Sequence, residues 1–258
     1  MLLAIDIGNT STTLGVFQQG VLKSFYRISS RHSLTEDEAG VMIQQFFGYE
    51  AVRGLRDVIV CSVVPSLTST YQQMSLKYLQ KKPLIVDSKL KLGIKIKYKD
   101  PSQVGADRLA NAVAAHRIYR GPCIVVDLGT ATTFDVISAR GDYLGGAIAP
   151  GIQTSSADLF RRAAQLFGVK LEKPPLAIGR TTQESLQSGI ILGAAGQIDF
   201  IVNQIEKEIG KKCRVIATGG LAPLVWKVSK KIQKIDLTLT LKGLYYIYKI
   251  LRGKKLDR

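Results

Sequence analysis

The sequence has few of the residues that build disulfide frameworks or zinc sites. It contains three cysteines and two histidines in 258 residues. Cys61, Cys123 and Cys213 are odd in number, widely spaced and placed in or beside apolar runs, which is typical of reduced thiols in a protein core. His32 and His116 lie far apart and have no ligand-like neighbours. These scarcities argue against a disulfide scaffold and a zinc site, and they fit a cytoplasmic protein.

Long apolar runs are also missing. No stretch approaches the roughly 20 consecutive apolar residues that span a membrane. Asp6 interrupts the apolar start of the chain too early for a secretory signal. We therefore expect a protein that has no membrane segment and acts in the cytoplasm.

Acidic residues are in the minority, with 20 Asp and Glu against 36 Lys and Arg, a formal net charge of +16. Between Lys89 and Lys99, lysines alternate with apolar residues, which predicts a half-buried strand with a basic face in solvent. Other lysines form scattered pairs, such as Lys254-Lys255, without interleaved aromatic residues. We expect a solvated basic surface that attracts ATP or an acidic substrate, and no dedicated nucleic-acid site; polyanion binding stays open as an alternative.

The sequence does have a polar turn between two apolar runs at its start, which predicts strand, tight turn and strand. The turn region comprises Asp6, Ile7, Gly8, Asn9, Thr10, Ser11, Thr12 and Thr13. Gly8 lets the backbone approach a ligand closely, and the N–H groups and hydroxyls after it could bind phosphate oxygens. Asp6 would tolerate a phosphate nearby only through a divalent cation or its waters. An ordinary polar hairpin turn would give the same pattern.

A second copy of this pattern strengthens the phosphate-binding hypothesis. Asp127-Leu128-Gly129-Thr130 stands between apolar runs, and Asp127 follows Asp6 by 121 residues, as Gly141 follows Gly20. The segments 58–65 and 215–223 also share a pattern. The duplication predicts an α/β protein of two ribonuclease-H-like lobes, residues 1–115 and 116–258, that hold a nucleotide's phosphates between two hairpins. This layout resembles the actin-like ATPase superfamily of actin, heat-shock chaperones and sugar kinases.

Around the hairpins, the pattern predicts helices ending near Phe47 and spanning 66–80, 154–167, about 183–209 and 243–251. Leu159, Ala163 and Leu166 would lie on the inner face of the third of these helices. Pro150 and the small residues of the segment 145–152 predict a fixed turn with close backbone approach.

A further motif, Gly105-Ala106-Asp107-Arg108, stands where a loop passes into a predicted helix. The N-terminal end of a helix stabilises a carboxylate such as Asp107 and disfavours a cation, so we expect Arg108 to point elsewhere. A carboxylate that accepts a hydroxyl proton, beside an arginine that grips an acid group, would suit phosphoryl transfer to an alcohol that carries a carboxylate.

In their residues and their order, these three motifs resemble those of the type III pantothenate kinases, over nearly the whole chain. The resemblance implies ATP-dependent phosphorylation of pantothenate to 4'-phosphopantothenate, the first step of coenzyme A biosynthesis. It implies that Asp107 is the catalytic base, that residues 6–13 and Thr130 contact ATP, and that Asp127 binds a monovalent cation, K⁺ or NH₄⁺. Mg²⁺ would lie near Asp6, through water. The implied pantothenate contacts are Tyr98, Gly105, Ala106, Asp107, Arg108 and Thr182; before Thr182 the family often has Asn, and here it is Thr181.

The long predicted helix carries Gly189, Gly193 and Gly196 on nearly one side. Each glycine inside a helix costs roughly 1 kcal/mol relative to alanine, so another helix is expected to approach closely there. That helix could belong to the same chain or to a second subunit. The family resemblance favours a homodimer with the pantothenate site completed across its interface.

Other functions remain open at this point. A phosphatase of the same superfamily, or a kinase for another small alcohol, would keep the hairpins without needing residues 105–108 and Tyr98. A non-catalytic, nucleotide-binding transcriptional accessory factor of the same family would fit the basic charge. The joint presence of Asp6, Asp107, Asp127 and Thr130 favours the enzyme.

Overall fold

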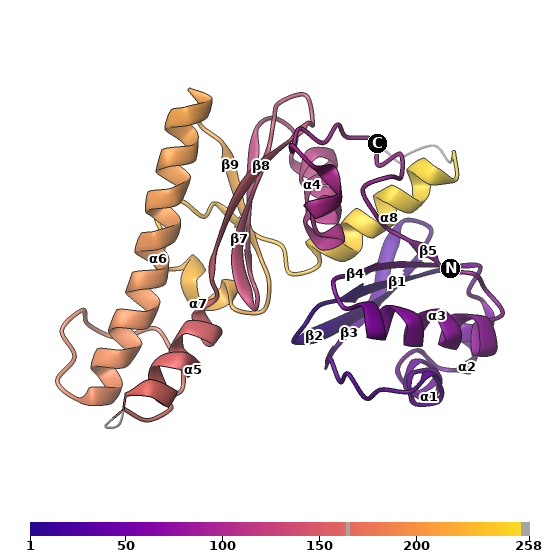
Figure 1. Ribbon diagram of the computed structural model, residues 1–258, viewed down its shortest axis with the longest axis horizontal. Helices are drawn as coiled ribbons and strands as arrows, with labels where there is room; N and C mark the ends of the chain where they lie inside the picture. Colours follow the sequence, from indigo (N-terminus) through magenta and orange to yellow (C-terminus); the bar gives the residue numbers. More distant parts are fainter. Residues whose placement is uncertain (164–165, 254–258) are drawn as a thin grey trace. The chain divides into compact units, whose positions relative to one another are not determined.

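The computed structural model describes residues 1–163 and 166–253, and its chain separates into two compact units (Figure 1). The first unit comprises Met1–Ile118 and the segment from Thr238 on; the second comprises Tyr119–Leu237. The predicted lobes, 1–115 and 116–258, differ from these units mainly in the C-terminal segment, which packs on the first unit. The lysine pair 254–255 lies outside the described residues.

The first unit is built on a sheet with strand order β3-β2-β1-β4-β5. Strands β1, β2 and β3 form an antiparallel meander, and β4 and β5 continue from β1 in parallel. The strands are β1 (Leu2–Ile7), β2 (Ser11–Gln18), β3 (Val21–Ser29), β4 (Asp57–Ser62) and β5 (Leu84–Ile85), and the helices are α1 (Glu36–Phe47), α2 (Tyr49–Arg53), α3 (Pro65–Leu79), α4 (Ala106–Tyr119) and α8 (Leu239–Leu251), with a 3₁₀ turn at Pro101–Gln103.

The second unit repeats this topology with strand order β10-β9-β6-β7-β8. Again the first three strands form an antiparallel meander, and two parallel strands continue from its first strand. Its elements are β6 (Cys123–Leu128), β7 (Ala131–Ile137), β8 (Tyr143–Pro150), α5 (Ile152–Arg162), α6 (Thr182–Ile209), β9 (Arg214–Thr218), α7 (Ala222–Trp226) and β10 (Lys234–Ile235). The predicted duplication of an α/β lobe is therefore confirmed.

The sheet of the first unit is apolar on both faces because helices cover both. Leu3, Ile5 and Ile7 alternate along β1 and pack with residues of α1 and α3. Against the opposite face lies α8, whose Leu241 contacts the position of Gly15 and whose Tyr245 stacks on Phe17 at 4.9 Å between ring centroids. Helix α8 begins four residues before the predicted start at Gly243.

The core of the second unit lies between its sheet and the helices α6 and α7. Ile124, Val126 and Leu128 of β6 pack with Ala195, Ile198 and Val202 of α6. By length and composition alone, α6 is apolar enough to cross a membrane, contrary to the expectation that no such stretch exists. Its buried side chains, however, belong to the core of this unit, so α6 is a core helix.

The predicted basic strand between Lys89 and Lys99 is wrong, although its alternation of exposure is real. The five lysines are exposed and Leu92 is buried, yet the segment forms no strand beyond a single bridge at Ile96. Two features interrupt an extended course: Asp87 accepts hydrogen bonds from two following amides, and Gly93 has a φ of +76°.

Two expectations after the second hairpin also need correction. The glycine-rich segment is not a turn but strand β8, in which a side chain at Gly146 would collide with the carbonyl of Phe134 on β7. The predicted helix 154–167 runs instead from Ile152 to Arg162, and Leu159 is 42% exposed because Ile152 and Ser156 form the buried side. Residues 164–165 of that prediction lie outside the described residues.

Candidate functional site

The first hairpin joins β1 to β2 through a three-residue turn, Gly8–Thr10. Asp6 pairs with Thr13 and Ile7 with Thr12, and the Gly8 amide donates to the Ser11 carbonyl at 3.0 Å. Asn9 and Thr10 are exposed, whereas Thr12 is buried. The residues predicted to contact ATP therefore comprise the end of β1, an exposed turn and the start of β2.

Asp6 lies beside a thiol from the neighbouring strand. Cys61 is the register partner of Asp6 on β4, is fully buried, and donates from Sγ to Asp6 Oδ1 at 3.2 Å. Burial, followed by the carboxylates of Asp6 and Asp107, raises the pKa of Cys61 well above its usual value. Cys61 is therefore a thiol that orients a carboxylate, and sequence reasoning had assigned it only to the core.

Asp107 lies in the first turn of α4, close enough to Asp6 that both carboxylates act on the same thiol. Burial raises the pKa of Asp107, while the Arg108 amide, which donates to Asp107 Oδ1 at 2.8 Å, and the Arg108 charge lower it. A Cβ at Gly105 would lie 2.5 Å from Asp107 Oδ1, which explains glycine at that position. A carboxylate with a raised pKa is better suited to accept a proton than an exposed one.

The other candidate substrate contacts of the first unit flank this carboxylate. Arg108 is buried, with 8% of its surface exposed, and Ala106 is buried beside it. Half-buried Tyr98 precedes the 3₁₀ turn Pro101–Gln103, which Asp100 caps by accepting from the Ser102 amide at 2.9 Å. The first unit thus brings together Asp6, its hairpin and the 105–108 motif.

The second hairpin has the same Asp-x-Gly start but a shorter turn. Asp127 pairs with Thr133, and only Gly129 and Thr130 separate β6 from β7. The offset between the two copies therefore falls from 121 residues on the first strand to 120 on the second, so that Thr12 corresponds to buried Thr132. The sequence pattern did not reveal this one-residue deletion.

The turn of the second hairpin is supported by the start of α5. The Thr154 hydroxyl donates to the Thr130 carbonyl at 2.7 Å, and a side chain at Gly151 would collide with that carbonyl. The predicted close backbone approach in this glycine-rich segment is therefore confirmed. Thr182 lies exposed at the first position of α6, where Thr181 is the N-cap and accepts from the Glu184 amide at 3.1 Å.

Asp127 faces the turn after β9. Gly219 has a φ of +87°, and a Cβ there would lie 2.5 Å from Asp127 Oδ1. A carboxylate and a backbone in such close contact leave no room for any other residue type at 219. In the sequence, the only sign of this contact is the glycine pair Gly219-Gly220.

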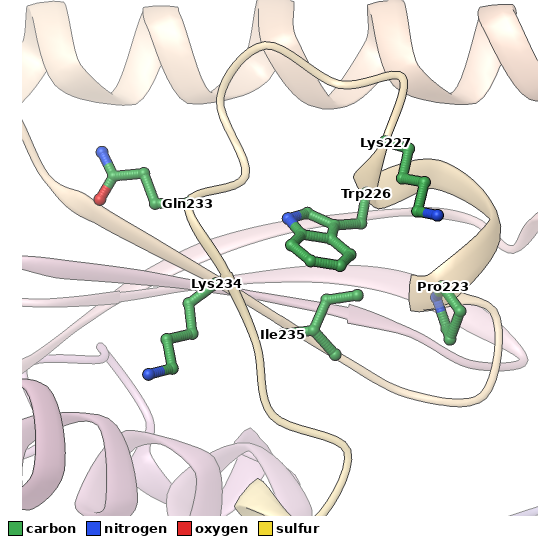
Figure 2. Close-up of a pocket in the computed structure, with 6 residues that line it drawn as sticks. All are labelled: Pro223, Trp226, Lys227, Gln233, Lys234 and Ile235. Atoms are coloured by element: carbon green, nitrogen blue, oxygen red, sulfur yellow. The ribbon is translucent and has the colours of Figure 1, made fainter.

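One turn of helix beyond that glycine pair lies a pocket of about 520 Å³ (Figure 2). Trp226, 41% exposed on α7, and Ile235 of β10 line it together with Pro223, Lys227, Gln233 and Lys234. The pocket combines a flat aromatic side chain with two cations, a combination suited to an aromatic ligand that carries negative charge. Sequence reasoning did not find it, because its walls come from two separate segments.

Metal binding at the two hairpins would have to rely on few protein ligands. Among residues 1–163 and 166–253, no three His, Cys, Asp or Glu side chains cluster as a metal site. Mg²⁺ is commonly held by one or two carboxylates together with water and substrate phosphates, so a single carboxylate at Asp6 is compatible with it. The oxygen donors at the end of β6, including Asp127, are of the type that hard cations prefer.

Comparisons with known proteins identify relatives of this chain. The family model of type III pantothenate kinase matches residues 2–204. Type III pantothenate kinase of Anaeromyxobacter dehalogenans (strain 2CP-C) is 47% identical over 251 residues, covering 96% of this chain and 98% of that protein. The same enzyme of Moorella thermoacetica is 45% identical over 250 residues, with 96% and 98% covered.

Solved structures share the fold at much lower identity. A Baf family transcriptional activator from Campylobacter jejuni aligns with a TM-score of 0.61 at 21% identity, covering 97% of this chain and 99% of that one. The ROK hexokinase from Thermus thermophilus aligns with a TM-score of 0.54 at 13% identity, with 98% and 99% covered. These likenesses confirm the actin-like ATPase fold, and the close relatives identify the family: the chain belongs to the type III pantothenate kinases.

Proposed function

We propose that this chain transfers the γ-phosphoryl group of ATP to the hydroxyl of pantothenate, with Asp107 as the group that receives the hydroxyl proton. The observation that carries the proposal is the half-buried carboxylate of Asp107 in the first turn of α4, with its raised pKa, close to Asp6 within one unit. Transfer then requires the hydroxyl to be aimed in line with the phosphorus atom. Because the transition state of phosphoryl transfer is loose, aiming the hydroxyl matters as much as basicity.

The nucleotide would use both hairpins. The turn amides and hydroxyls of residues 8–13 would bind phosphate oxygens, and Thr130 would bind them from the second hairpin. Mg²⁺ near Asp6 and K⁺ or NH₄⁺ near Asp127 would offset the charge of the phosphates. The adenine base of ATP would enter the pocket at Trp226. This pocket follows the pair Gly219-Gly220, which adjoins Asp127.

Pantothenate would be held by the segment that carries Asp107. Arg108 and Tyr98 would bind its carboxylate end, and Gly105 and Ala106 would let the chain of the substrate approach the backbone. Thr182 would supply a further polar contact. Of these, Arg108 is the group with charge complementary to the substrate.

We further propose that the enzyme is a cytoplasmic homodimer formed through α6. Gly189, Gly193 and Gly196 are exposed, and in the described chain a Cβ built on any of them meets no atom within 4 Å apart from its chain neighbours and the nearby backbone of α6. Phe200, on the same side of the helix, is 64% exposed. Glycine destabilises a helix relative to alanine, and close packing against a second copy of α6 would offset this loss.

The test is release of ADP by the purified protein with Mg-ATP and pantothenate, in potassium, ammonium and sodium buffers. We expect turnover that requires pantothenate and one of the two larger cations. Turnover without pantothenate would indicate an ATPase or another acceptor. A folded protein that binds ATP and shows no turnover in any buffer would contradict the kinase proposal and favour a regulatory role.

A further inference from the structure

Ser30, the first residue after β3, makes three hydrogen bonds to the first hairpin, two to its turn and one to Thr12 of β2. Its Oγ donates to the Gly8 carbonyl at 2.6 Å and lies 2.9 Å from the Thr12 hydroxyl, and its amide donates to the Thr10 carbonyl at 3.0 Å. No sequence motif singled out this half-buried serine. Ser30 thus contacts the first and the last residue of the turn that would bind the phosphates.

These bonds determine where turn amides point. A peptide group is planar, and in the trans form its C=O and N–H point in opposite directions. The described chain has no cis peptide bond. Because the carbonyls of Gly8 and Thr10 point toward Ser30, the N–H groups of Asn9 and Ser11 point away from it. Ser30 thereby turns two acceptors inward and two donors outward, which is the polarity that an anion requires.

The second hairpin has an analogous support built from other elements. There the hydroxyl of Thr154, in α5, donates to the carbonyl of Thr130 and so fixes the direction of the Ala131 amide. A hydroxyl that holds a turn carbonyl therefore occurs in both units, although β3 and α5 are unrelated elements. This repetition indicates that the orientation of the turn peptides matters to both hairpins.

We propose that Ser30 is a positioning residue for the nucleotide: its hydroxyl holds the Gly8 carbonyl and so aims the amide of Asn9 at a phosphate oxygen. The Thr10 carbonyl is held by the backbone amide of Ser30, which every variant keeps. The inference rests on the proposed function, since it assumes that the first hairpin binds phosphate. It predicts a role confined to the phosphates, because the three hydrogen bonds of Ser30 all go to the first hairpin.

The experiment compares Ser30→Ala with Ser30→Thr, which keeps the hydroxyl, and with Ser29→Ala, which alters the exposed neighbour. Affinities for Mg-ATP and for adenosine are measured by calorimetry on the full chain. We expect Ser30→Ala to weaken Mg-ATP binding about 5- to 20-fold, the effect of losing the two part-buried hydrogen bonds of the serine hydroxyl, and adenosine binding less than about 2-fold. Ser30→Thr and Ser29→Ala should stay within about 3-fold of wild type for both ligands.

Equal losses for Mg-ATP and adenosine would overturn the inference, because a purely structural role would not distinguish the two ligands. So would a Ser30→Ala variant that binds as Ser29→Ala does. If Ser30→Ala does not fold, Ser30→Cys, which keeps a weak donor, should show a smaller loss selective for Mg-ATP. Wild type that binds Mg-ATP without phosphorylating pantothenate would contradict the kinase proposal alone and leave this comparison decisive for Ser30.

Discussion

The two hairpins start alike and end differently. In each, an aspartate is the last residue but one of the first strand and pairs with a residue of the neighbouring parallel strand that carries a donor group. Cys61 pairs with Asp6, and Thr218 pairs with Asp127. The first hairpin then has a three-residue turn and lies near a second carboxylate, Asp107. The second has a two-residue turn, and its aspartate contacts glycine backbone at 219. Duplication preserved the sheet, whereas the turns and their surroundings diverged toward separate tasks.

The largest effect should come from replacing Asp107, the second carboxylate, which lies near the first hairpin and has no counterpart described at the second. We expect Asp107→Asn to lower kcat by about 100-fold or more, since a positioned base contributes about 10²- to 10⁴-fold. Asp100→Asn is the matched control, because Asp100 caps the preceding turn and is exposed. Steady-state ADP release measures both variants, and turnover near that of wild type in Asp107→Asn would refute the base assignment.

The next largest effect should come from replacing Gly219, which lies against Asp127. Gly219→Ala puts a Cβ at positive φ onto the carboxylate, and we expect about 1–3 kcal/mol lower stability and about 10-fold weaker activation by K⁺. Gly129→Ala is the control, since its nearest contact would be an ordinary 3.7 Å. Denaturant unfolding and a potassium titration of activity separate the two effects. Equal behaviour of the two variants would show that the contact at Asp127 has no functional weight.

A smaller effect should follow from loss of the thiol beside Asp6. Cys61→Val keeps the site apolar and removes the donor, so we expect KM for Mg-ATP to rise about 3- to 10-fold, in keeping with a weak donor to a charged acceptor. Cys61→Ser, which keeps a donor, should restore most of the loss. Cys123→Val controls for a buried thiol that donates to backbone carbonyls in the other unit. An unchanged KM in Cys61→Val would indicate that the strand alone positions Asp6.

The smallest effect on catalysis is expected from Glu206, which forms ion pairs with Lys212 and Lys231 within the second unit. Burial raises the pKa of Glu206, but hydrogen bonds from Lys231, the Cys213 amide and Lys212 outweigh it and lower the pKa from 4.5 to about 2. A lowered pKa stabilises the fold above pH 4.5, and this contribution is lost as the pH falls toward 2.

We therefore expect Glu206→Gln to cost about 2 kcal/mol at pH 7, with kcat nearly unchanged. The difference from wild type should shrink steadily below pH 4.5. Thermal unfolding at several pH values measures it. A difference that stays constant down to pH 3 would show that packing, and not charge, accounts for the loss.

Most of the fold could be predicted because its signals are local. Continuous apolar runs, each interrupted by one aspartate, specify β1 and β6, and a capping box at Thr35 and Glu38 marks the start of α1. The segment Lys89–Lys99 shows where such signals fail. Alternation of polar and apolar residues follows from one-sided burial, and an extended loop lying on a core satisfies it as well as a strand does.

The candidate site was predicted as a set of motifs, but not as a set of contacts. Asp6, Asp107 and Asp127 each stand in a recognisable local pattern. Cys61 and Ser30 do not, because their importance depends on which residue lies opposite in space. Strand pairing brings Cys61 to Asp6, and the return of β3 brings Ser30 to Gly8. Such pairings become visible only when the register of the sheet is known.

The last helix gives the molecule an order of assembly. Helix α8 packs on the sheet of the first unit, and its Tyr248 hydroxyl donates to Asp57 at 2.6 Å. The second unit, by contrast, is one continuous stretch of chain. During synthesis, therefore, the lobe whose translation begins first is completed last. One face of its sheet stays uncovered until α8 has been made. By then the inserted lobe already has all its strands and can close its own core.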